Sequence, residues 1–194
     1  MIDPSGRSAG AAAPLAGRTR LVLVPGRAFG TGEHPTTRLA IEALERHVTP
    51  GSRWLDLGCG SGILSLVASC CGAAEVLALD VDPVAVRVAR AAMRRNPVGR
   101  GVVVRLGTQA GVGIWDGVVS NISATHLCEC AAQLARLPRP GGTLVVSGFV
   151  EAERDEVWQA LERAGLRRIE TRHSVEWCLM VLARPPDGAA GRPR

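Results

Sequence analysis

The stretch that decides the fold is Asp56-Leu57-Gly58-Cys59-Gly60-Ser61-Gly62. It follows an apolar run at 54–57, which predicts a short buried strand, and precedes an apolar run at 63–70, which predicts a helix. Glycines permit positive φ and let backbone N–H groups approach a ligand closely, and a helix N-terminus carries partial positive charge. This strand, loop and helix therefore predict a ligand site where the strand ends.

The glycine spacing narrows the class of ligand. A dinucleotide-binding G-x-G-x-x-G would need its third glycine at position 63, which is Ile, so the G-x-G-x-G spacing favours a nucleoside without a pyrophosphate. Asp80 ends the next predicted strand, 75–79, where a carboxylate can accept hydrogen bonds from both ribose hydroxyls. Because ligands lie at the carboxyl ends of parallel strands, we expect Gly58, Asp80 and Asn121 to converge.

Strand and helix signals alternate along the rest of the chain. The last two strand signals, 166–171 and 177–182, leave no room for a crossover helix and should pair as a hairpin. The pattern predicts an α/β fold, a doubly wound and mostly parallel seven-stranded sheet with a C-terminal antiparallel hairpin. The other predicted segments are strands at 102–104, 117–121 and 143–147, helices at 127–137 and 151–164, and a turn at 140–142.

One predicted helix begins at an N-cap, Asp82, with proline in its first position, and stops before Asn96. Its pattern gives one apolar side and one arginine side, and the arginine side is either solvated surface or a contact for ribosomal RNA. The apolar side holds Val84, Val88 and Ala92, and the arginine side holds Arg87, Arg90 and Arg94.

Composition excludes several kinds of chemistry. All 23 of the Lys and Arg residues among the 194 are Arg, and the chain has no Lys or Tyr, which excludes Schiff-base chemistry, a P-loop lysine and tyrosine general acids. The net charge of +5 lies mostly in the tails: residues 1–20 and 184–194 carry +2 each, which leaves +1 for residues 21–183. We therefore expect no direct nucleic-acid binding.

The ends of the chain lack periodicity. We expect residues 1–20 to form a flexible lead-in, residues 21–184 a single domain, and residues 185–194 a disordered tail. The six cysteines lack the paired spacing of a zinc site, so no metal is expected, and Cys128 and Cys130 are interpreted as helix packing. No signal segment or membrane span is evident, which predicts a cytoplasmic protein with reduced thiols.

Each candidate site residue also has a purely structural interpretation. The three glycines could serve only as turn residues, and Asp80 could only cap a loop. Asp56 and Asp116 could orient loops from strand ends without touching a ligand, which is the interpretation we favour for Asp116. Asn121 could be a buried turn amide.

At these residues the chain resembles the class I S-adenosylmethionine-dependent methyltransferases, which have a Rossmann-like fold. The stretch PGRAFGTGEHPTT, residues 25–37, resembles the signature of the PrmA-type methyltransferases, which modify ribosomal protein L11. The resemblance covers residues 21–184 and continues through DLGCGSGIL (56–64), ALDVDPVAV (78–86), SNISA (120–124), PRPGGTLVVSGF (138–149) and EWCLMVLAR (176–184).

This resemblance implies S-adenosyl-L-methionine as cofactor, S-adenosyl-L-homocysteine as product, and methyl transfer to a protein or peptide amine, with a ribosomal protein as one candidate. It implies that the loop 29–34 folds over the cofactor, although the same stretch would also open a helix well. Asn121 is expected to be catalytic as well as cofactor-binding. The expected cofactor-binding residues are Phe29, Gly30, Thr31, His34, Thr37, Asp56, Gly58, Gly60, Gly62, Asp80 and Asn121.

The sequence departs from the family pattern in two places. Only about twenty residues precede the signature, where the family usually has a domain that presents the substrate. The family more often has Ile-Leu-Ala after the asparagine and a proline near the position of His126, which we interpret as an exposed helix residue rather than a base. Two alternatives therefore stay open: a methyltransferase of a small molecule or peptide product, and a non-catalytic cofactor-binding module that needs a partner chain.

Overall fold

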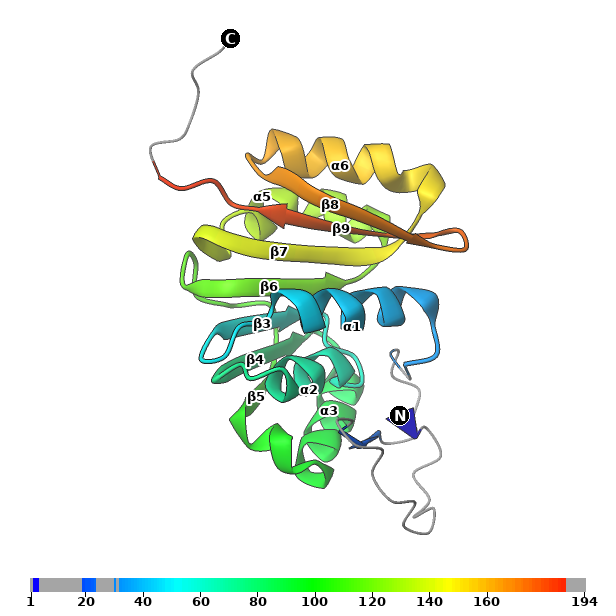
Figure 1. The fold of residues 1–194 in the computed structure, drawn as a ribbon, viewed down its shortest axis with the longest axis vertical. Helices are drawn as coiled ribbons and strands as arrows, with labels where there is room; N and C mark the ends of the chain where they lie inside the picture. The colour runs from blue at the N-terminus through cyan, green and yellow to red at the C-terminus, as the bar shows by residue number, and fades with distance from the viewer. Residues whose placement is uncertain (1, 4–18, 24–29, 31, 188–194) are drawn as a thin grey trace.

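The computed structural model describes residues 2–3, 19–23, 30 and 32–187 of the chain. Its centre is a seven-stranded sheet in the order β5-β4-β3-β6-β7-β9-β8 (Figure 1). The strands are β3 Arg53–Leu57, β4 Glu75–Asp80, β5 Val102–Leu106, β6 Trp115–Asn121, β7 Pro138–Val150, β8 Arg167–Ser174 and β9 Trp177–Ala183. A separate pair, β1 Ile2–Asp3 and β2 Leu21–Val22, is parallel.

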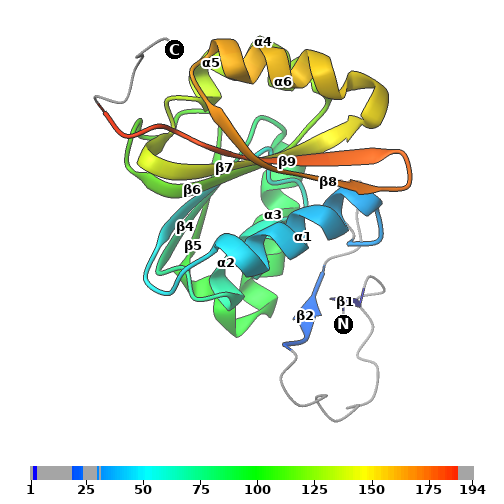
Figure 2. The same ribbon diagram turned by 45° about the horizontal axis from the view of Figure 1, so that its top comes forward.

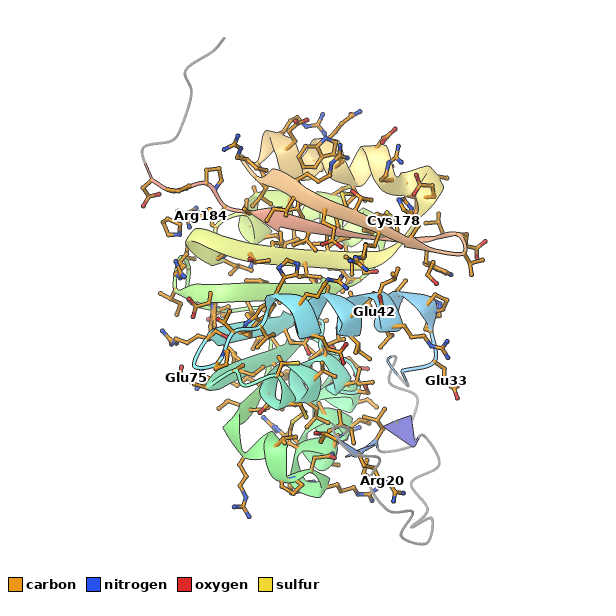
Figure 3. The ribbon with its side chains drawn as sticks, in the orientation of Figure 1. Arg20, Glu33, Glu42, Glu75, Cys178 and Arg184 are labelled. Atoms are coloured by element: carbon orange, nitrogen blue, oxygen red, sulfur yellow. The ribbon has the colours of Figure 1, made fainter. Side chains whose placement is uncertain are left out.

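The pairing confirms the predicted fold class. The five strands from β5 to β7 run parallel, whereas β9 runs antiparallel to both β7 and β8. The strand order reverses beside β3, so the carboxyl ends of β3, β4 and β6 meet at one edge of the sheet. Glu33, just before the first helix, and Glu75, where β4 begins, lie at opposite ends of the strands (Figure 3).

Helices cover both faces of the sheet, as doubly wound folds require (Figure 2). On one face α1–α3 enclose an apolar core with residues such as Leu44 and Leu66, and on the other α4–α6 enclose a second core with Leu127 and Leu161. The helices are α1 Pro35–His47, α2 Ile63–Cys70, α3 Pro83–Arg95, α4 Ala124–Glu129, α5 Ala131–Leu134 and α6 Arg154–Arg163, with 3-10 turns η1 Pro97–Gly101 and η2 Glu151–Glu153. Within the described ranges, no helix has the length and apolar character that a membrane span requires.

Helix α3 begins as expected, but its predicted apolar side is wrong. The Asp82 side chain accepts a hydrogen bond from Val84 N at 2.7 Å, which confirms the N-cap. Of the three residues predicted for the apolar side, only Ala92 is buried, and Val84 is 39% exposed. The buried face is built mainly from alanines, which let the helix lie close to the sheet, so the larger valines are a misleading guide to its orientation. The buried residues of α3 are Ala85, Val86, Ala89, Ala92 and Met93.

Two other predicted segments, the helix at 127–137 and the turn at 140–142, also differ from the structure. The predicted helix 127–137 is two short helices that begin at Ala124 and are interrupted at Cys130, whose φ of −101° and ψ of 11° are not helical. The predicted turn 140–142 lies inside β7, because the backbone there still pairs with the chain after β9. Gly141 N donates to Arg184 O at 2.8 Å, and Arg184 N donates to Gly142 O at 3.0 Å.

A glycine in β6 makes room for the largest fully buried side chain, Trp54. Trp54 on β3 is fully buried and pairs with Gly117 on β6. A Cβ atom built on Gly117 would lie 2.3 Å from the indole ring of Trp54, closer than real Cβ contacts come. The indole therefore packs directly over the backbone of the neighbouring strand.

A buried asparagine attaches β2 to the domain. The Asn96 amide pairs with both backbone groups of Val22: Val22 N donates to Asn96 Oδ1 at 2.8 Å, and Asn96 Nδ2 donates to Val22 O at 2.9 Å. Asn96 Nδ2 also donates to Ala92 O at 2.7 Å. Leu21 and Leu23 on either side are buried in the α1–α3 core. Most of residues 1–20 lie outside the described ranges, so the predicted lead-in stays a prediction.

We expect Asn96→Ala to lower the free energy of unfolding by roughly 2–3 kcal/mol, because it leaves two part-buried backbone groups of Val22 and the buried carbonyl of Ala92 without this partner. Urea unfolding followed by far-UV circular dichroism measures the change. Arg95→Ala, on the exposed neighbouring residue, is the control and should stay within about 0.5 kcal/mol of wild type. Equal stabilities for the two variants would contradict this role for Asn96.

Candidate active site

The glycine loop 58–62 joins β3 to α2, and its shape depends on backbone conformations that favour glycine. Gly58, Gly60 and Gly62 all have positive φ, at 77°, 53° and 81°. A Cβ atom on Gly58 would lie 2.6 Å from Ile122 Cγ2, and one on Gly62 would lie 2.6 Å from Met93 Cε. The loop needs glycine both for its backbone turns and for close approach to its neighbours.

The end of β4 holds this loop in place. Gly58 N and Cys59 N both donate to Leu79 O, at 2.8 and 3.0 Å. The Asp80 carboxylate accepts from Gly60 N on one oxygen and from Asp82 N on the other, each at 2.9 Å. Asp80 therefore caps the loop, as its structural interpretation predicted. It also lines a cavity at this end of the sheet.

A cavity of about 1000 Å³ opens at the carboxyl ends of the parallel strands. It receives residues from the ends of β3, β4 and β6, so the expected convergence of these strand ends is confirmed. This volume is in the range of pockets that hold drug-sized ligands and cofactors. The predicted site residues that line it are Gly30, His34, Thr37, Gly58, Gly60, Asp80 and Asn121.

The structure does not bring two other predicted residues to the cavity wall. Asp56 is fully buried in β3, where it accepts a hydrogen bond from Ser65 Oγ on α2 at 2.6 Å. Gly62 packs against α3 as the N-cap of α2. Both support the loop from behind, so the expectation that they bind the ligand directly gains no support from the geometry. Phe29 and Thr31 lie outside the described residues.

Two buried oxygens in the cavity wall lack hydrogen-bond partners. Neither Thr37 Oγ1 nor Asn121 Oδ1 has a partner among the described residues, although both atoms are buried. Buried polar side-chain atoms are usually hydrogen-bonded, because burial without a partner costs about 1–3 kcal/mol. Both residues line the cavity, which places these unpartnered oxygens beside the space that a ligand would fill.

The loop before α1 is attached to the glycine loop. Ser61 Oγ donates a hydrogen bond to Gly30 O at 2.5 Å. A Cβ atom on Gly30 would lie 2.9 Å from Ser61 Oγ. His34 then caps α1 by accepting from Thr36 N at 3.4 Å through Nδ1. The residue pattern 25–37 thus combines a helix start with a contribution to the cavity wall.

Sequence reasoning missed an aromatic residue of the site. Trp177, in the first position of β9, lines the cavity, and its ring centroid lies 4.6 Å from that of His34 with the ring planes at 70°. No spacing signal connects these two residues, because they meet only when the hairpin folds back beside β7. His126 and Ser123 also line the cavity, with Ser123 Oγ 2.7 Å from His126 Nδ1, and His126 is an exposed residue of α4 as expected.

Asp116, which we interpreted as a loop-orienting residue, lies at the opposite end of β6 from Asn121. Its carboxylate accepts from Arg53 N at 2.8 Å and from Arg139 Nε at 2.6 Å. Burial raises the pKa of Asp116, but these hydrogen bonds and the two arginine charges outweigh burial and lower it overall. Asp116 therefore connects the starts of three strands and takes no part in the cavity.

The Cys59 thiol in the glycine loop and the Asp56 carboxyl behind the loop both have raised pKa values. Burial, reduced in part by the hydrogen bonds from Ser65, raises the pKa of Asp56 to about 7. Burial and the charges of Asp56 and Asp80 raise the pKa of the Cys59 thiol well above its usual value. Cys59 lines the cavity as a neutral thiol, which is a poor nucleophile.

Comparison with protein families matches residues 8–185 to the family described as ribosomal protein L11 methyltransferase (PrmA). The chain belongs to this family. A ribosomal protein L11 methyltransferase of Chloroflexus aurantiacus is 41% identical over 191 residues, which cover 85% of this chain and 58% of that protein. One of Ralstonia pickettii is 50% identical over 137 residues, which cover 71% of this chain and 45% of that protein.

A solved structure of the same family has the same fold. The ribosomal protein L11 methylase of Lactobacillus delbrueckii subsp. bulgaricus superposes with a TM-score of 0.80 at 25% identity, over 90% of each chain. The predicted family membership is therefore confirmed. The chain spans about half the length of the curated relatives it matches.

We expect Asp56→Asn to stabilise the protein more at pH 8 than at pH 5. Folding raises the pKa of the Asp56 carboxyl from 3.8 to about 7, so between these pH values the unfolded state loses its proton while the folded state retains it. The contribution of Asp56 to the free energy of unfolding is therefore fully present below pH 3.8 and is lost as the pH rises to about 7. The asparagine avoids this loss. Its stability advantage over wild type should therefore grow by roughly 3 kcal/mol from pH 5 to pH 8, at about 1.4 kcal/mol per pKa unit.

Urea unfolding at fixed pH values measures this difference. Ser65→Ala provides a matched comparison, because it removes a hydroxyl that lowers the pKa of Asp56 and should extend the pH dependence to higher pH. A stability difference between Asp56→Asn and wild type that stays constant from pH 5 to pH 8 would show that Asp56 is ionised throughout.

Proposed function

We propose that this chain is an S-adenosyl-L-methionine-dependent N-methyltransferase that transfers a methyl group to a protein or peptide amine and releases S-adenosyl-L-homocysteine. The observation that carries the proposal is the cavity in which a glycine loop, Asp80 and two unpartnered acceptor oxygens meet, in a chain of the PrmA family. The glycine spacing, with Ile63 in place of a third dinucleotide glycine, supports a nucleoside cofactor over NAD.

The residues present fit this cofactor. Gly60 lines the cavity without a side chain of its own, which helps a ligand to approach the loop backbone there, whereas Ile122 Cγ2 occupies the space beside Gly58. Each Asp80 oxygen accepts one backbone N–H, and a carboxylate oxygen has capacity for a second hydrogen bond, such as one from a ribose hydroxyl. Thr37 Oγ1 and Asn121 Oδ1 are further acceptors for polar groups of the cofactor or the substrate.

When bound, the cofactor supplies an electrophilic methyl group on a sulfonium, so the protein needs no nucleophile of its own. What the residues of this chain provide is position, and an aligned acceptor and donor can account for about 7–11 kcal/mol of a reaction barrier. The neutral Cys59 thiol in the loop does not compete as a methyl acceptor.

Asn121 has the position and the chemistry to orient an amine. An amine with a pKa of about 10.4 is protonated at neutral pH and must lose that proton before it attacks. Burial in the cavity lowers the pKa of an amine. The Asn121 Oδ1 acceptor can then receive one of the remaining amine N–H bonds and direct the lone pair.

The substrate proposal follows the family. The curated relatives are named for methylation of ribosomal protein L11, so L11 is the first acceptor to test, and a ribosomal substrate would place the reaction in the cytoplasm. Incubation of the chain with methyl-labelled cofactor and either purified L11 or a cell extract tests the proposal. Label in L11 or another protein supports it, label in small molecules favours the alternative substrate class, and cofactor binding without transfer favours a non-catalytic module.

We expect Asp80→Ala to weaken S-adenosylhomocysteine binding by roughly 1.5–3 kcal/mol, the range for a hydrogen bond to a charged group. Asp80→Asn keeps the size but replaces one acceptor oxygen with a donor, so it should also weaken binding. Isothermal titration calorimetry measures both variants. Glu75→Gln, an exposed carboxylate at the start of the same strand, is the control. Wild-type affinity in both Asp80 variants would remove Asp80 from the binding site.

We expect the single-turnover rate of methyl transfer to rise between pH 7 and pH 9, by up to roughly tenfold per unit, because the free amine is the attacking species. Asn121→Ala should lower this rate more than it lowers cofactor affinity. Thr37→Val, which removes the other unpartnered oxygen at nearly constant size, provides the matched comparison. A flat pH profile would exclude amine chemistry, and equal losses of rate and affinity would make Asn121 a cofactor ligand only.

A further inference from the structure

A second group of chemically active side chains lies on the α4–α6 side of the hairpin. Among the residues that the structure describes, one group of His, Cys, Asp or Glu offers three possible metal-ligand atoms within 4.8 Å of one another: Glu151, His173 and Cys178. Cys178 lies on β9, next in sequence to Trp177 of the cavity (Figure 3). Cysteine spacing does not reveal this group, because Glu151 on η2 is far in sequence from the hairpin that carries His173 and Cys178.

Strand pairing fixes the positions of these three residues. His173 on β8 pairs directly with Cys178 on β9. On the other side of β9, Phe149 of β7 also pairs with Cys178, and β7 ends one residue before Glu151. Glu151 N donates to Glu176 O in the hairpin turn at 2.8 Å, which attaches the start of η2 to the hairpin. The paired strands β8 and β9, and the 3-10 turn η2 that directly follows β7, thus bring the three side chains together.

The carboxylate of Glu151 is already oriented toward the other two side chains. Its Oε1 is paired with the Arg154 guanidinium, while its Oε2 lies 2.6 Å from His173 Nδ1. Oε2 is buried beside both the His173 imidazole and the Cys178 thiol. An arginine that holds one carboxylate oxygen while the other faces the ligand position is the kind of outer contact that orients metal ligands.

The donor set has the chemistry of a zinc site. A thiol sulfur, an imidazole nitrogen and a carboxylate oxygen are the three protein ligand types of Zn²⁺, and three protein ligands leave a fourth position for water. A mixed sulfur, nitrogen and oxygen set disfavours Mg²⁺ and Ca²⁺, which prefer oxygen ligands. The thiolate and the carboxylate would together balance the charge of a divalent ion.

We propose that Glu151, His173 and Cys178 bind one divalent transition-metal ion, with Zn²⁺ as the preferred ion, at a site distinct from the cofactor cavity. Binding forms a bond from the metal to Cys178 Sγ and releases the thiol proton to solvent, with no change of oxidation state.

The metal site would hold β9 next to Trp177, a residue of the cavity wall. Trp177 precedes Cys178 and points its ring at His34, whereas Cys178 belongs to the core on the other face of the sheet. A bound ion would fix β8 and β9 to η2, and with them the position of Trp177. This inference stands on the cluster alone and does not depend on the proposed methyl transfer.

Equilibrium dialysis of the untagged full chain against Zn²⁺, with the metal measured by mass spectrometry, tests the site. We expect one equivalent of zinc per chain. Titration with Co²⁺ should produce a near-ultraviolet thiolate-to-cobalt absorption band, which reports sulfur ligation directly. Cys178→Ser and His173→Ala should each reduce zinc affinity by at least roughly tenfold, and Cys178→Ser should abolish the band.

Cys128→Ser is the matched control, because it removes another thiol on the same face of the sheet and should leave both signals unchanged. Cys178 is fully buried and its replacement could disturb folding, so the half-exposed His173 gives the second, independent variant. Absence of stoichiometric uptake, a cobalt band that persists in Cys178→Ser, or a band lost in Cys128→Ser would each overturn the proposal.

Discussion

The attachment of the glycine loop to the end of β4 is the contact on which the cavity depends. Leu79 O accepts hydrogen bonds from two N–H groups of the loop. The Asp80 carboxylate accepts one from Gly60 N in the loop and one from Asp82 N just before α3. The same side chain thus completes the backbone hydrogen bonding of the loop and forms part of the cavity wall. A loop with so many positive-φ residues needs such support, because glycine loses more conformational freedom on folding than other residues do.

Parallel strands explain why much of the cavity could be predicted from the sequence. Gly58, Asp80 and Asn121 each follow a buried apolar run, and neighbouring parallel strands deliver such residues to one edge of the sheet. The direction of a side chain at a strand end is harder to predict. Asp56 and Asp80 both lie at the ends of β-strands near the glycine loop, yet Asp56 points to Ser65 on α2 behind the loop and Asp80 points to its front.

The contacts made by the antiparallel hairpin β8–β9 could not be predicted from the sequence. The hairpin brings Trp177 to His34 and brings His173 and Cys178 to Glu151, and neither meeting leaves a regular spacing in the chain. The faces of α3 and the break at Cys130 were missed for a different reason. The orientation of α3 follows the close packing of its alanines against the sheet, which a pattern of larger apolar residues does not report, and the break at Cys130 is a local backbone change that interrupts an otherwise apolar pattern.

The contact between Trp54 and Gly117 has a consequence for how this core could change. The indole fills space that the missing side chain at position 117 leaves free, so the two positions share a single volume. A side chain at 117 could enter only if residue 54 became smaller, and a smaller residue 54 would leave a void that only a side chain at 117 could fill. The two positions are therefore constrained to vary together rather than one at a time.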